Sequence, residues 1–180
     1  MLTGPYSGQY AWIMGPITLS HMDASISADH TKDWEVNVER YARSHNYQYS
    51  TRDEDLTYNP DNEVVGTSIL QRVFDVKNKS KDMEAVVGAI KSIKETLVKL
   101  DADIARRVYR NQFRSADRKD ISLVYPFESW TRFENSNGLP PNFATAYDKI
   151  NGKGSWQKNV VKVLDNHTDG WYDEIRVMIK

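Results

Sequence analysis

The first and last thirds of the chain resemble each other, and this internal repeat constrains the fold more than any other feature. The matching positions, at one constant spacing, are Trp34, Asn37, Val38 and His45 in the first copy and Trp156, Asn159, Val160 and His167 in the second. An apolar run ending at Pro16 has a similar counterpart ending at Pro126. The shared order is apolar run, proline, amphipathic helix, histidine and aromatic strand, which predicts two related structural units in tandem.

The second unit, expected over residues 67–180, has the clearer pattern. Residues 67–77 are rich in β-branched and aromatic types and predict a strand that is covered on both faces. Apolar residues at spacings of three and four predict a long helix after Ser80, the expected N-cap. Later elements are predicted as strands at 103–113 and 120–125, a helix in two pieces from 143 to 167, and, after a turn at 167–170, a strand at 171–180. This order is the split βαβ arrangement of a ferredoxin-like unit.

The first unit, expected over residues 1–60, contains only part of that order. It has a predicted strand at 8–14, a helix at 29–45 and a strand at 46–58, and a turn-rich linker at 61–66 follows. By comparison with the second unit it lacks the opening strand, helix and strand. The predicted fold class is therefore α+β, with two sheets that bury their helix-free faces against each other.

Two ferredoxin-like units packed sheet to sheet resemble the dimeric α+β barrel superfamily. This group includes antibiotic-biosynthesis-type monooxygenases, stress-responsive barrel proteins, and NIPSNAP-like and EthD-like proteins. The resemblance rests on element order and duplication across residues 7–180, and the incomplete first unit departs from it. It implies a cavity for a small organic molecule between sheet and helices; some members oxidise their ligand without a metal or flavin, and some bind haem. Either the chain is a fragment, or a second copy completes it as a homodimer.

Composition excludes several other classes of protein. A hydrophobic content of 39% and a charged content of 27% are typical of a soluble globular protein. A formal charge of −1 creates no long-range field that would favour nucleic acid, and no apolar run reaches the length of a membrane span. The chain has no cysteine, which excludes disulfides and thiolate catalysis but leaves the compartment undetermined. We therefore expect neither a nucleic-acid nor a membrane partner.

The repeated helix supplies the first candidate site residues. His167 and His45 lie at its C-terminal end, where a histidine acts either as a general base or as a helix cap favoured by the dipole. Two further pairs of matching positions have alternative roles. Trp156 and Trp34 either stack on a ligand or belong to the hydrophobic core. Asn159 and Asn37 either hydrogen-bond a ligand or hold a loop in place.

The strands supply the second group. Tyr125 precedes Pro126, and Arg107 and Tyr109 share one face of the neighbouring predicted strand. If these strands pair, the three side chains can project into one volume that suits an acidic phenol, a quinol or a carboxylate, although ordinary cross-strand pairing explains them equally.

These residues lead to two principal hypotheses. In the first, the protein binds a small organic ligand and acts as a cofactor-independent oxygenase or isomerase, with His167 as the base and Asn159, Tyr125 and Arg107 positioning the ligand. In the second, it is a non-enzymatic binding or assembly module in which Trp156 and its neighbours fill the core. A haem protein with His167 or His45 as axial ligand is a weaker alternative. No cofactor and no metal are predicted, because no set of His, Asp and Glu has ligand spacing.

Overall fold

The computed structural model describes most of the chain as two compact units. It leaves residues 6, 12, 14, 16, 25, 43–47, 60–67, 78–79, 114–119, 137 and 178–180 undescribed. One unit contains residues 1–9 and 49–180, and the other contains residues 10–48. The expected linker at 61–66 lies outside the described residues, so the predicted boundary between 1–60 and 67–180 stays a prediction.

A five-stranded antiparallel sheet forms the centre of the larger unit. Its strands are β1 (Ser50–Arg52), β2 (Ser68–Val76), β3 (Arg107–Asn111), β4 (Ile121–Phe127) and β5 (Thr168–Val177). They lie in the order β1-β3-β4-β2-β5. Since β4 lies between β2 and β3, the βαβ unit they form is split, and the order of β2 to β5 is compatible with a ferredoxin-like fold.

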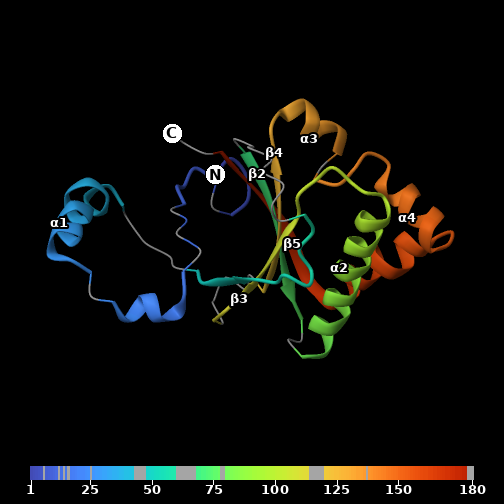
Figure 1. Cartoon of the computed structure of the whole chain (residues 1–180), viewed down its shortest axis with the longest axis horizontal. Helices are drawn as coiled ribbons and strands as arrows, with labels where there is room; N and C mark the ends of the chain where they lie inside the picture. Colours follow the sequence, from blue (N-terminus) through green and yellow to red (C-terminus); the bar gives the residue numbers. More distant parts are fainter. Residues whose placement is uncertain are drawn as a thin grey trace. The chain divides into compact units, whose positions relative to one another are not determined.

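Helices complete this unit. They are α2 (Lys81–Lys99), α3 (Trp130–Ser136), α4 (Phe143–Asn151), the π-helical turn η3 (Gln157–Val161) and α5 (Lys162–His167). In Figure 1, α2 and α4 lie on the same side of the sheet. From β2 to β5, the described elements follow one another as strand, helix, two strands, a series of helical segments and a final strand.

The main core lies between the sheet and α2. Alternate side chains of β2 and β4, among them Leu70, Phe74 and Ile121, point to the same side and pack with Val86 and Ile90 of α2. All five are at most 2% exposed. The period of two in the strands and of three to four in the helix thus produces one continuous apolar layer.

The helix-free face of β2 is also buried, as its apolar composition predicts. Val73 is 0% exposed, and Glu174 of β5, on the same face, is also 0% exposed. Residues 1–4 cover part of this region: the Leu2 amide donates to the Ile175 carbonyl at 2.7 Å. Gly4 has φ +83°, and a Cβ there would lie 2.9 Å from Glu174 Cγ, so a larger residue does not fit. No second sheet is formed among the described residues.

Several predicted boundaries were wrong. β4 does not stop before Pro126 but continues to Phe127. Proline has no backbone N–H to donate, so it is tolerated where a strand pairs on one side only. Pro126 is in such a position, because it pairs with β2 while β3 pairs with β4 only as far as Val124. β5 begins at Thr168, within the expected turn, because it pairs with Val76 there. The predicted strand at 103–113 is limited to β3.

The smaller unit differs most from its prediction. The predicted helix at 29–45 forms as α1 (Ala28–Asn37), capped by the Ser27 hydroxyl, followed by the 3₁₀ turn η2 (Glu39–Tyr41). The described residues of the expected strand at 8–14 are not in strand conformation. Among the described residues of the expected strand at 46–58, the strand β1 covers Ser50–Arg52, and it pairs with β3 in the sheet of the larger unit.

Truncating the core should destabilise the larger unit. Ile90→Ala removes buried methyl groups between α2 and the sheet, and we expect it to lower the free energy of unfolding by about 2–5 kcal/mol in urea titrations. Val98→Ala makes a similar truncation on the exposed side of the same helix, where Val98 is 57% exposed. Its effect should stay within about 0.5 kcal/mol, and equal losses in the two variants would contradict this packing.

Candidate functional site

A buried arginine and a buried tyrosine face each other beneath α2. In the β3–β4 ladder Arg107 pairs with Val124, so one step further along places Arg106 opposite Tyr125. Residues opposite each other in an antiparallel pair project to the same face. Tyr125 belongs to the core cluster that packs against α2, so both side chains lie on the helix-covered face.

Arg106 is 0% exposed and only partly satisfied. Its Nη2 donates to the carbonyls of Leu56 at 3.0 Å and Ile90 at 3.1 Å. Nε and Nη1 have no hydrogen-bond partner among the described residues. The Tyr125 phenol interacts electrostatically with the guanidinium, but it does not complete a hydrogen bond of normal geometry with either nitrogen. Burial lowers the pKa of Arg106, because the charged form is poorly solvated there.

Tyr125 also interacts with a second arginine. Arg72, on β2, lies diagonally across from it, since Leu70 pairs with Tyr125 and Arg72 with Leu123. Burial raises the pKa of the Tyr125 phenol, and the charges of Arg106 and Arg72 only partly oppose this effect. The phenol is therefore a neutral hydrogen-bond donor at neutral pH.

The two arginines differ in charge compensation. Arg72 forms a bidentate ion pair with Asp173 of β5, with Nε and Nη2 each 2.8 Å from a carboxylate oxygen. Arg106 has no carboxylate partner among the described residues. A buried cation without a counterion is costly. This cluster of Arg72, Tyr125, Arg106 and Asp173 therefore carries one uncompensated positive charge.

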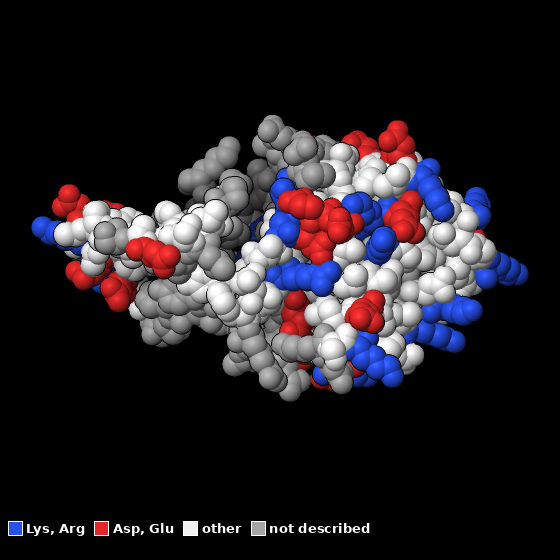
Figure 2. Space-filling view, turned by 60° about the horizontal axis from the view of Figure 1, so that its bottom comes forward, with Lys and Arg blue, Asp and Glu red and all other residues white. Residues whose placement is uncertain are grey.

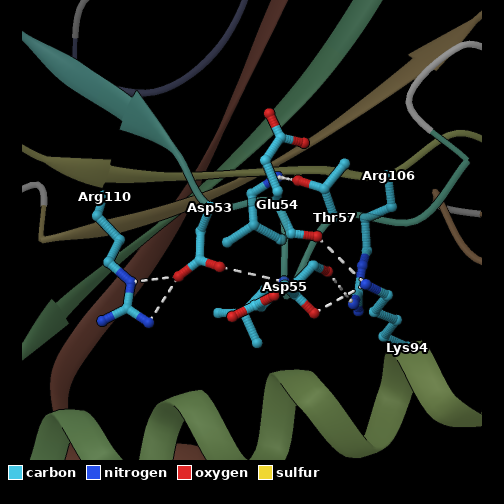
Figure 3. Close-up of polar contacts among 9 residues, drawn as sticks. Asp53, Glu54, Asp55, Thr57, Lys94, Arg106 and Arg110 are labelled. Carbon is cyan, nitrogen blue, oxygen red and sulfur yellow. Dashed lines mark hydrogen bonds and ion pairs between the residues drawn. The ribbon is translucent and has the colours of Figure 1, made fainter.

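A short turn, residues 53–57, covers Arg106 next to α2 (Figure 3). Its two ends are attached to the backbone of Val108: the Asp53 amide donates to the Val108 carbonyl at 2.8 Å, and the Val108 amide donates to Thr57 Oγ1 at 3.1 Å. Asp53 also pairs with Arg110 at 2.6 Å. Lys94 of α2 holds the middle of the turn, donating to the carbonyls of Glu54 at 3.2 Å and Asp55 at 2.8 Å.

The structure does not bring the three predicted strand residues together. Arg107 and Tyr109 lie opposite Val124 and Ser122, whose side chains are on the face away from Tyr125. Arg106 takes the place that was expected for Arg107. The sequence did contain a signal for this parity. Val108 is the one aliphatic residue within residues 106–110, and it is buried, so the even-numbered side chains of this strand face the core.

The described candidate residues of the second predicted helix, Trp156, Asn159 and His167, lie outside this cluster. Trp156 packs edge-to-face against Phe143 and Tyr147, with ring centroids 5.7 Å and 5.4 Å away, and so fills space between α4 and α2. Asn159 is exposed on η3. His167 lies at the end of α5, and its Nδ1 is 2.7 Å from Asp82 Oδ1 in the first turn of α2. The position of His167 fits the structural alternative, in which the histidine caps the C-terminal end of a helix.

In the smaller unit, Trp34 is half-buried on α1, and Asn37 is exposed and donates to Asp33 Oδ1 at 2.7 Å. His45 lies outside the described residues.

A hollow of about 330 Å³ lies on the described surface. It is lined by Asp55, Lys91, Lys94, Glu95, Val98 and Lys99, beside the turn 53–57. Acidic and basic side chains are interspersed over the face drawn in Figure 2. Among the described residues, no cluster of three His, Asp or Glu residues could hold a metal ion, and none of the helices is long and apolar enough to cross a membrane.

Asp148 fixes the start of the helix that carries Trp156 and His167. Its carboxylate accepts from the amides of Trp156 at 2.7 Å and Gly154 at 2.8 Å, and these bonds lower the pKa of Asp148. Hydrogen bonds to the ionised form stabilise that form in the folded state.

Stability should therefore depend on pH through this carboxylate. Its contribution is fully present above the unfolded pKa of about 3.9 and is lost as the pH falls through the lower, folded value. We expect Asp148→Asn to reduce the urea midpoint at pH 7 and to differ progressively less from wild type below pH 4. Asp165→Asn, an exposed change on α5, serves as the control. A difference that persists unchanged at low pH would contradict this assignment.

The contact between His167 and Asp82 can be measured with a double-mutant cycle. His167→Gln, Asp82→Asn and the double variant should give a coupling energy of roughly 0.2–1 kcal/mol, because both side chains remain partly exposed. Zero coupling would show that the two helix ends are held by other contacts.

Comparison of the chain with family models, with curated proteins and with solved structures finds no match.

Proposed function

We propose that this protein binds a small organic monoanion, a carboxylate, phenolate or enolate, at the cluster of Arg72, Tyr125, Arg106 and Asp173. The observation that carries the proposal is Arg106: it is fully buried, and two of its nitrogens have no partner among the described residues. Such donors are normally satisfied by protein, water or ligand. An anion that accepts from Arg106 supplies the missing counterion as well as the missing acceptor.

The charges of the neighbouring groups favour a ligand with a single negative charge. Arg72 is already neutralised by Asp173, which leaves one positive charge for the ligand. The neutral Tyr125 can donate its O–H to a second ligand oxygen, or to the same one. Leu70, Leu123 and Ile90 in the surrounding core favour an apolar body on the ligand.

The same proposal includes the finer fold assignment. The split order of β2 to β5 supports membership in the dimeric α+β barrel superfamily, whose members often bind small organic molecules. Tandem units and a homodimer remain predictions within it. The proposal covers binding rather than turnover, since the expected base, His167, lies at the helix ends beside Asp82.

One observation favours a second candidate, the non-enzymatic assembly module. Trp156, Phe143 and Tyr147 pack tightly where a cavity beneath the second helix was expected. In that case Arg106 serves only to fasten the turn 53–57 to α2.

Binding measurements separate the two candidates. We expect benzoate or salicylate at pH 7 to raise the melting temperature of the full chain and to bind in calorimetry, while uncharged benzamide does neither. Arg106→Met should weaken binding by at least about tenfold, and Tyr125→Phe, which keeps the ring, by roughly fivefold.

Tyr109→Phe is the matched control, because Tyr109 lies on the opposite face of the sheet. Equal binding of the acid and the amide, or equal losses in Tyr125→Phe and Tyr109→Phe, would overturn the proposal. If none of a panel of small aromatic and aliphatic acids binds to the wild-type protein, the assembly module becomes the better reading.

A further inference from the structure

We infer that residues 54–56 form a gate over Arg106, and that Lys94 is its latch. This inference rests on the proposed function and adds the route by which an anion reaches the buried guanidinium. It follows from how the turn 53–57 is attached, from what lies beneath it, and from what lies outside it.

Arg106 lies directly under the seam between the turn and α2. Its Nη2 donates to Leu56 in the turn and to Ile90 in the helix, so one nitrogen spans both sides of the seam. Separating the turn from α2 would therefore expose this nitrogen before any strand pairing is disturbed.

The hollow of about 330 Å³ lies on the outer side of the same seam. Asp55 of the turn and Lys94 of α2 both line it, together with Lys91 and Lys99. Three lysines against two carboxylates give this wall a net positive charge, which raises the local concentration of anions. The turn and α2, which both accept hydrogen bonds from Arg106, therefore also border this hollow.

The turn is anchored at its ends, and its middle is bonded to Lys94 and Arg106 (Figure 3). Within the turn, the Leu56 amide donates to the carbonyl and the carboxylate of Asp53. Asp53 and Thr57 are bonded to Val108 of β3, as described above. Between them, the carbonyls of residues 54–56 are held by Lys94 and Arg106 alone among the described hydrogen bonds. Hydrogen bonds between an exposed ammonium group and carbonyls are weak in net terms, because water replaces them readily.

These contacts define how the gate would work. Lys94 releases the carbonyls of Glu54 and Asp55, the middle of the turn moves away from α2, and the Leu56 carbonyl leaves Arg106 Nη2. The ligand anion then reaches the unused donors, Nε and Nη1, and the turn closes again over the complex. Opening costs the burial of Leu56, which is 2% exposed, and this keeps the gate closed most of the time.

Lys94→Met in the full chain tests the latch without any ligand. We expect hydrogen exchange of the amides at 54–57, and cleavage after Glu54 by endoproteinase Glu-C under native conditions, to accelerate roughly fivefold. Lys91→Met removes the same charge from the hollow but no described bond to the turn, and its exchange and cleavage should match wild type.

Benzoate is the probe for the gate itself. In stopped-flow measurements, Lys94→Met should raise the association and dissociation rates together, leaving Kd within about twofold of wild type, because the latch bonds are absent from the binding site. If exchange in Lys94→Met matches Lys91→Met, or if exchange accelerates while both benzoate rates stay at wild-type values, the gate is refuted and the binding site stands. If wild-type protein binds no acid, the proposed function fails and the gate fails with it.

Discussion

The structure depends on β2 being enclosed on every side. It pairs with β4 along one edge and with β5 along the other. Its side chains point alternately to the face that packs against α2 and to the buried helix-free face. A strand in this position has no exposed backbone and almost no exposed side chain, so it fixes the register of its neighbours. Through β4, that register places Tyr125 beneath α2, and through β3 it places Arg106 opposite Tyr125.

Much of the larger unit could be predicted from sequence because its elements are long and strongly periodic. The α2 helix spans nineteen residues, with apolar groups at regular spacing, and β2 is apolar on both faces. The ends of the strands were less predictable. β4 runs through Pro126 because its pairing with β3 ends before that residue, and where the pairing ends is specified only by the tertiary structure. The smaller unit illustrates the limit further, since α1 and η2 bury no side chains and their sequence pattern therefore carried little information about packing.

The strand residues of the candidate site illustrate how parity decides which side chains can meet. Tyr125 and an arginine do meet on the covered face, yet the arginine is Arg106 rather than Arg107, a shift of one residue that reverses the face. A strand of alternating long polar side chains gives little indication of which parity is buried, and Val108 was the only guide. The turn 53–57 was not predicted as part of the site, because its acidic residues resemble a solvated loop, and their attachments to β3 and α2 come from distant parts of the chain.

The two borders of the sheet are protected in different ways. β1 is only three residues long and ends in Arg52. A short edge strand with a charged residue is a poor template for pairing with a strand of another molecule. β5 is much longer, and the Leu2 amide and Thr3 hydroxyl occupy part of its outer backbone. The first residues of the chain thus act as a guard against strand-to-strand polymerisation. Loss of these contacts would leave the outer backbone groups of β5 open to self-association.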